Sequence, residues 1–257
     1  MLFNSVEFFM FFPIVVLLYW VIPKKVRYLW LLVASYYFYM GWNASYAILI
    51  AVSTGITYLC GLGIEALGKK EEKKYLVARK LVVAAGFVSN LGILFFYKYF
   101  DFFLENCNHI LTALGKEPVV NGFSVLLPVG ISFYTFQALG YMVDVYRGEI
   151  IAEKNPLKYA LFVSFFPQLV AGPIERSKNL LEQIRDIPDR KTFEYKRVAN
   201  GLIVMLYGYF IKMVIADRIS IIVEYVFSHY FELGSVELIA GYGSYAIILQ
   251  PRSEERR

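Results

Sequence analysis

The chain has 257 residues, of which 58% are hydrophobic and 18% aromatic, and its mean hydropathy is +0.51. Only 18% are charged, whereas a soluble domain usually carries about 25% charged residues. The net charge of +5 comes from basic blocks beside long apolar runs, without the basic and aromatic stripe of a nucleic-acid-binding surface. This composition excludes a soluble enzyme and a nucleic-acid partner. It predicts an all-α integral membrane protein whose main partner is the lipid bilayer.

The first hundred residues hold four predicted membrane crossings, each of which needs about 20 mostly apolar residues. The first runs from Val6 to Ile22. The uncharged stretch Tyr28–Ile64 is too long for one helix, and Gly41-Trp42-Asn43 predicts a turn that divides it into two short helices. The fourth crossing, Leu81–Tyr97, follows a charged loop at 69–80.

Beyond residue 100 the apolar stretches are more often interrupted. Residues 101–122 are mixed and predict an interfacial segment, as do residues 219–231. Leu126–Tyr146 and Val198–Ala216 are long and apolar enough to cross. Between them, Tyr159–Ile174 has only 16 uncharged residues and is broken by prolines and a glycine, so it does not predict a straight crossing.

Basic residues orient the predicted helices. The loops at 23–27, 69–80 and 175–197 contain three, six and seven Lys and Arg residues. The positive-inside rule therefore places all three in the cytoplasm and the N-terminus outside. If every apolar stretch crossed, the third loop would lie outside, and a re-entrant segment at 159–174 resolves this conflict. Because irregular backbone at membrane depth must be buried in protein or line a wet cavity, such a segment also predicts a site.

Ionisable residues within or beside the apolar stretches are the candidate cavity or structural residues, because charge is costly in hydrocarbon. Asp144 and Arg147 lie three residues apart on one predicted helix face and can pair. Lys212 lies five residues before Asp217, and its alternative role is an interfacial anchor whose long side chain reaches the headgroups. The whole set is Asp144, Arg147, Glu175, Arg176, Lys212 and Asp217.

The two histidines, His109 and His229, have no acid, cysteine or second histidine at the spacing of a catalytic triad or a metal site. We expect surface or interfacial positions for both. The sequence predicts no metal site and no bound cofactor, since it also lacks a phosphate loop and a dinucleotide fingerprint.

Two stretches are more distinctive than the composition requires. Leu126–Gln137 reads LLPVGISFYTFQ and continues to Asp144–Gly148, and Phe165–Arg176 reads FFPQLVAGPIER. Together with the opening Met1–Ser5 and the segment Lys212–Asp217, these stretches resemble the membrane-bound O-acyltransferase (MBOAT) family. The match is best with its bacterial branch, which O-acetylates exported polysaccharides such as alginate.

The resemblance implies a multi-pass helical bundle with re-entrant pieces in a bacterial plasma membrane, of which this chain corresponds to the N-terminal half. It implies an acyl donor, acetyl-CoA or similar, that enters from the cytoplasm. It also implies a core tunnel for the acyl group and, as a possible partner, an extracytoplasmic transferase or polysaccharide-assembly protein. The family's catalytic histidine lies well after the Lys212–Asp217 segment, so no catalytic residue is carried over, and we expect it beyond Arg257.

The end of the chain departs from the family pattern. The last apolar stretch, 238–249, is too short to cross, and Gln250–Arg257 is mostly charged. We expect residues 1–249 to form an incomplete MBOAT-like membrane region and residues 250–257 to form a short charged tail, either natural or read out of frame. On this interpretation the chain alone is inactive. The sequence leaves two alternatives open, a transporter or channel subunit and a non-catalytic membrane scaffold.

Overall fold

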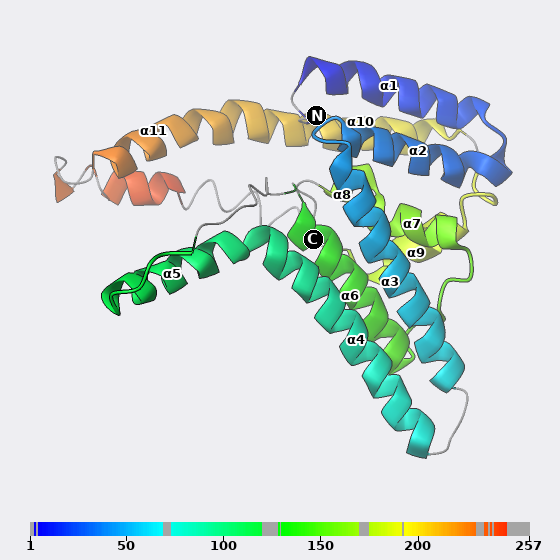
Figure 1. Ribbon diagram of the computed structural model, residues 1–257. Helices are drawn as coiled ribbons and strands as arrows, with labels where there is room; N and C mark the ends of the chain where they lie inside the picture. The colour runs from blue at the N-terminus through cyan, green and yellow to red at the C-terminus, as the bar shows by residue number, and fades with distance from the viewer. Residues whose placement is uncertain are drawn as a thin grey trace. The chain divides into compact units, whose positions relative to one another are not determined.

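The computed structural model describes residues 3, 5–68, 73–119, 128, 130–169, 175–191, 193–229, 234, 235, 237 and 239–245 (Figure 1). Within these residues the regular structure is entirely helical, which confirms the predicted all-α class. Three of the described helices are long and apolar enough to cross a membrane: Ser45–Gly68, Lys74–Lys98 and Tyr195–Ser228. The chain divides into two compact units, Met1–Arg190 and Lys191–Arg257.

The first unit opens with a hairpin of α1 (Val6–Val21) and α2 (Arg27–Met40), joined by a short 3₁₀ turn. Arg27 stabilises the hairpin, because its buried guanidinium donates to the carbonyl oxygens of Ile22 at 3.1 Å and Trp20 at 3.3 Å. These carbonyls lie at the end of α1 and have no partner within the helix. A cation at this end also interacts favourably with the negative end of the helix dipole. The crossing predicted at Val6–Ile22 thus coincides with a single helix.

The uncharged stretch after the hairpin is divided as predicted. Residues 41–44 separate α2 from α3 (Ser45–Gly68). The two helices differ in length, however. At about 1.5 Å per residue, the 14 residues of α2 span about 21 Å, which is less than the hydrocarbon core of about 30 Å. The predicted division into two short helices is confirmed; α3 is long enough to cross by itself, and the crossing by α2 stays a prediction.

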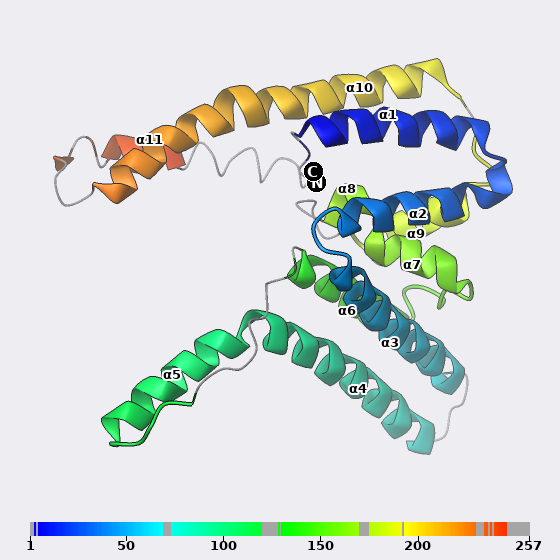
Figure 2. The same ribbon diagram turned by 45° about the horizontal axis from the view of Figure 1, so that its top comes forward.

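Three long helices, α3, α4 (Lys73–Lys98) and α6 (Ile131–Arg147), lie side by side in the first unit (Figures 1 and 2). Small residues allow them to approach closely: a Cβ added at Gly61 of α3 would lie 2.7 Å from the ring of Tyr141 of α6. Close approach at glycine is the usual way in which membrane helices gain packing contacts. The core therefore forms where α6 meets α3 and α4.

A broken segment, α7 (Pro156–Ser164) and α8 (Phe166–Leu169), packs against α2. Its side chains are among the most buried in the chain; Tyr159, Leu161 and Phe162 are all 0% exposed. The segment is short and interrupted, which agrees with the prediction that residues 159–174 do not form a straight crossing. Residues 170–174 lie outside the described residues, so the re-entrant path remains a prediction. Helix α9 (Ser177–Arg185) follows and packs against α7 and α6.

The second unit is dominated by one long apolar helix, composed of α10 (Tyr195–Phe210), the π-helical turn Ile211–Ala216 and α11 (Asp217–Ser228). The predicted crossing at 198–216 and the predicted interfacial stretch at 219–231 are thus parts of one continuous helix over the described residues. A helical piece at 239–245 packs against its end, where the rings of Phe227 and Tyr242 are 5.5 Å apart. Residues 246–257, which include the predicted tail, lie outside the described residues.

Candidate functional site

A helix break separates α7 from α8 within a buried segment of the first unit. Proline at position 167 has no N–H, and its ring would clash with the carbonyl group four residues earlier, which favours a break in the helix before it. Phe165 accordingly leaves the helical conformation, with φ −57° and ψ 112°, and α8 starts at the next residue. The sequence thus creates a kink inside a buried segment.

Two polar side chains satisfy the backbone groups that this break exposes. Gln137 of α6 donates from Nε2 to the Phe162 carbonyl oxygen at 2.8 Å, and the Phe166 N–H donates to Ser35 Oγ of α2 at 3.2 Å. Gln137 is 6% exposed and Ser35 is fully buried. Because a buried, unpaired backbone group costs about 1–3 kcal/mol, these contacts are needed to keep the break inside the unit.

The two distinctive motif stretches meet at this break. Gln137 Nε2, from the first stretch, lies 3.2 Å from Gln168 Oε1, from the second. At the start of α6, Gly130 has φ +76°, and a Cβ at this position would overlap the Leu169 carbonyl oxygen of α8. A residue without a side chain is therefore required where α6 begins against α8. We call the contact of Gly130 and Gln137 with residues 162–169 the α6–α8 junction.

A second polar cluster surrounds residues 149–153, at the other end of α6. Glu153 is 7% exposed and accepts from Arg185 Nε of α9 at 2.5 Å. The backbone N–H of Glu153 donates to the hydroxyl of Tyr141 at 2.9 Å, and the N–H of Ala152 donates to Glu65 Oε2 at 2.8 Å. The loop is thus fixed to α3, α6 and α9. A cavity of about 200 Å³ opens beside it, lined by residues 149–151 and by α9.

The predicted pair of Asp144 and Arg147 is not formed, and this prediction was wrong. Asp144 Oδ2 instead accepts from Ser177 Oγ, at the start of α9, at 2.7 Å, and Arg147 lies 3.8 Å from Glu149. The left-handed Gly148, at φ +78°, turns the chain back at the end of α6 and brings Glu149 toward Arg147. Asp144 therefore joins two helices instead of pairing within one.

The other predicted residues are divided between the two units. Glu175 and the exposed Arg176 directly precede α9, and in the described part of the chain their side chains make no hydrogen bond or ion pair. In the second unit, Lys212 and Asp217 form an ion pair across the π-helical turn. The structure thus pairs Lys212 with Asp217, whose five-residue spacing is unfavourable in an α-helix, but it does not pair Asp144 with Arg147. It places none of the six residues at the α6–α8 junction.

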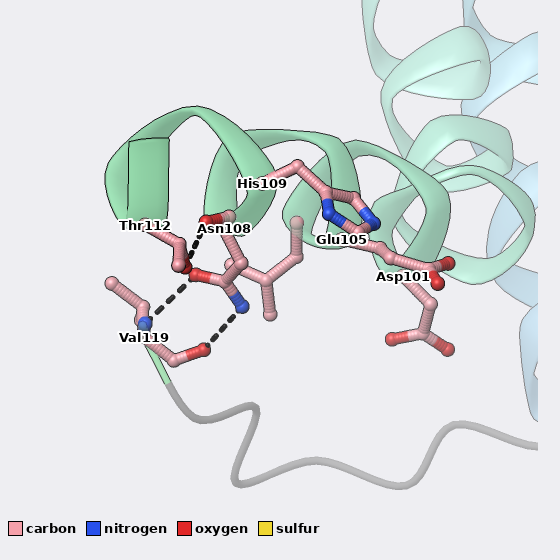
Figure 3. A pocket seen from close by; sticks show the side chains of 7 residues that line it. Asp101, Glu105, Asn108, His109, Thr112 and Val119 are labelled. Carbon is pink, nitrogen blue, oxygen red and sulfur yellow. Dashed lines mark hydrogen bonds between the residues drawn. The ribbon is translucent and has the colours of Figure 1, made fainter. Parts of the chain in front are cut away.

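Both histidines lie outside the buried parts of the two units. His109 is exposed on α5 (Phe100–Ala113), beside an open cavity of about 410 Å³ that Asp101, Glu105 and Asn108 also line (Figure 3). His229 is exposed at the end of α11 and stacks on Tyr225, with ring centroids 4.7 Å apart. Neither residue lies at the α6–α8 junction.

Sequence reasoning did not identify Gln137, Glu153 or Arg185 as key side chains. A signal existed for Gln137, because it is a polar residue within the apolar stretch Leu126–Tyr146 and belongs to a distinctive motif. Glu153 and Arg185 lie 32 residues apart in loop and helix sequence with no local pattern, so only the tertiary structure reveals their pairing.

Comparison with known proteins identifies relatives over most of the chain. The probable alginate O-acetylase of Pseudomonas aeruginosa is 36% identical over 225 residues, which cover 88% of this chain and 41% of the relative. The peptidoglycan O-acetyltransferase of Helicobacter pylori is 32% identical, over 88% of this chain and 46% of the relative. A teichoic acid D-alanyltransferase of Streptococcus thermophilus is 31% identical over 42% of this chain and 26% of its own length.

The chain spans less than half the length of the curated O-acetylases that it matches. No family model matches the chain, and no solved structure matches it. Two of the motif stretches that carry the resemblance meet at the α6–α8 junction. The resemblance to membrane-bound O-acyltransferases is thus confirmed over the part of these bacterial O-acetylases that the chain covers.

Proposed function

We propose that the chain forms part of an O-acyltransferase that passes acetyl or similar acyl groups across the membrane to exported cell-surface polysaccharide. The observation that carries this proposal is the α6–α8 junction, where two family motifs meet at a buried helix break beside long apolar helices. The relatives are named for acyl transfer to alginate, peptidoglycan and teichoic acid. These names favour acyl transfer over a transporter, a channel subunit or a non-catalytic scaffold.

The donor in this proposal is acetyl-CoA or a similar cytoplasmic acyl carrier, and the membrane is the bacterial plasma membrane. The partner is an extracytoplasmic transferase or a polysaccharide-assembly protein that receives the acyl group outside. Irregular backbone is tolerated at membrane depth only where protein buries it or a wet cavity adjoins it. The α7–α8 break is therefore a structural element around which a path for the acyl group can form.

The functional test uses the bacterium that produces the chain. Deletion of the gene should reduce O-acetyl esters on the exported polysaccharide to background, and the gene restored at its own locus should return them. The esters are measured by proton NMR of the purified polymer. Acetylation that is unchanged by the deletion contradicts the proposal.

We further propose that residues 1–257 produced alone do not transfer acyl groups. A general base must reach the attacking hydroxyl and titrate near neutral pH, which histidine does most often, and both histidines here are exposed. A bacterium without its own O-acetylation system should therefore gain no O-acetyl esters when it produces this chain. Acetylation that is lost in His109→Ala or His229→Ala would overturn this statement.

The proposed orientation has the N-terminus outside and the basic loops in the cytoplasm.

Cysteine labelling tests this orientation, after Cys60 and Cys107 are replaced by serine. A membrane-impermeant maleimide should label Ala44→Cys in intact cells, but should label Lys24→Cys and Asp189→Cys only after permeabilisation; all three native residues are exposed. Labelling of Asp189→Cys in intact cells contradicts the re-entrant path of residues 159–174.

A further inference from the structure

The long helix of the second unit contains an ion pair in a mostly apolar sequence. The helix Tyr195–Ser228 has 34 residues, and its most apolar window is not buried by any other part of the described chain. Lys212 lies 16 residues after Lys196, which is about 24 Å along the helix. If the basic start of the helix lies at headgroup level, the ion pair of Lys212 and Asp217 falls within the hydrocarbon core of about 30 Å.

The π-helical turn explains how these two residues meet. In an α-helix, residues five apart are separated by about 140° around the axis and do not face each other. In a π-helical turn the hydrogen bonds run from i to i+5, and here the Asp217 N–H donates to the Lys212 carbonyl oxygen. The turn thus accommodates one extra residue. As a result, Asp217 lies next to Lys212 on the helix surface, where the residue four positions after Lys212 would lie in a regular α-helix.

The same extra residue aligns the polar and small residues of α10 with those of α11. Up to the turn, Gly201, Gly208 and Lys212 are seven and four residues apart, so they lie on one helix face. After it, Asp217, Glu224 and Ser228 have the same spacings and lie on one face of α11. The turn joins the two faces. The resulting polar stripe consists of Gly201, Gly208, Lys212, Asp217, Glu224 and Ser228. Ile203, Leu206 and Ile222 are exposed on the opposite side.

We propose that the polar stripe faces water within the membrane region, and that the π-helical turn serves to keep it continuous. Ionisable residues in membrane helices face a protein interior or a water-filled cavity, because lipid does not solvate them. Glu224 makes no hydrogen bond or ion pair through its carboxylate in the described part of the chain; at about 42 Å along the helix from Lys196, it extends the stripe to the level of the far headgroups. Gly201 and Gly208 leave space there, since no atom lies within 4 Å of a Cβ added at either.

This inference rests on the membrane crossing of the helix and not on the proposed acyl transfer. It is tested by cysteine substitution in a Cys60→Ser, Cys107→Ser background, with a charged methanethiosulfonate reagent on membranes open to both sides. Thiols react as thiolates, which form in water, so Gly201→Cys, Gly208→Cys and Glu224→Cys should react at least about tenfold faster than matched Ile203→Cys, Leu206→Cys and Ile222→Cys. Equal rates, or slower reaction of the stripe, overturn the proposal.

Two single-residue deletions test the role of the turn. Deletion of Val214, inside the turn, places Lys212 and Asp217 four residues apart in a regular α-helix, so fast reaction of Glu224→Cys should persist. Deletion of Ile219, in α11, rotates the rest of the helix by about 100° and should slow that reaction to the rate of Ile222→Cys. If both deletions slow the reaction equally, the turn does not set the register of the stripe.

Discussion

Substitution of Gly130 by alanine should unfold the α6–α8 junction and remove most of the folded protein. Two effects add at this position. Alanine at φ +76° costs about 1–2 kcal/mol because of the left-handed backbone. Its Cβ would also overlap the Leu169 carbonyl oxygen, which belongs to the backbone and cannot rotate away, and such overpacking costs about 1–3 kcal/mol. We therefore expect a loss of about 2–5 kcal/mol, a large part of the stability of an ordinary domain.

Gly140→Ala in the same helix is the matched control for this experiment. Gly140 does not have a positive φ, and a Cβ there would meet no atom within 4 Å. Because alanine favours a helix by about 1 kcal/mol over glycine, the control should be as stable as the parent or more stable. The measurement is the melting temperature of each purified variant in the same detergent. Equal melting temperatures for Gly130→Ala and Gly140→Ala would show that the junction does not contribute to the fold.

Loss of the ion pair between Glu153 and Arg185 should have the second largest effect on the stability of the protein. Removal of one partner of a fully buried pair costs about 3–5 kcal/mol. Glu153 is buried, but the Arg185 side chain is 35% exposed and keeps some hydration, so we expect Glu153→Gln to cost about 2–3 kcal/mol. Arg185→Met should cost a similar amount, and the double variant less than the sum, since the two side chains interact directly.

The exposed pair of Arg147 and Glu149 provides the control, because its side chains are 65% and 54% exposed. Glu149→Gln should change the unfolding free energy by less than about 1 kcal/mol. The measurement is a double-mutant cycle on both pairs by denaturant unfolding in mixed micelles. An interaction energy near zero for Glu153 and Arg185 would mean that α9 is not fixed to the 149–153 loop in this way.

The sequence predicted those features of the fold that depend on neighbouring residues, such as helix ends and breaks. Pro23 and the basic residues after it end α1, the turn after α2 divides the stretch 28–64, and Pro167 breaks the segment between α7 and α8. Each of these follows from backbone chemistry or hydrophobic length.

The side-chain contacts were predicted less well, because they depend on tertiary structure. Asp144 and Arg147 are suitably spaced on one helix face, yet Asp144 binds Ser177 from a helix 33 residues later. The spacing of Lys212 and Asp217 is unfavourable for a pair in an α-helix, yet the π-helical turn brings them together. Gln137 lies in a predicted crossing, but its partner, the Phe162 carbonyl, becomes available only because α7 ends.

The central claim, that this chain acts in O-acyl transfer to exported polysaccharide, is tested most directly by the O-acetyl ester content of that polymer. The measurement compares the parent bacterium, a deletion strain, and strains with Gly130→Ala or Gly140→Ala at the natural locus. We predict parental ester content with Gly140→Ala and background content both in the deletion strain and with Gly130→Ala. Parental ester content in the deletion strain would contradict the account.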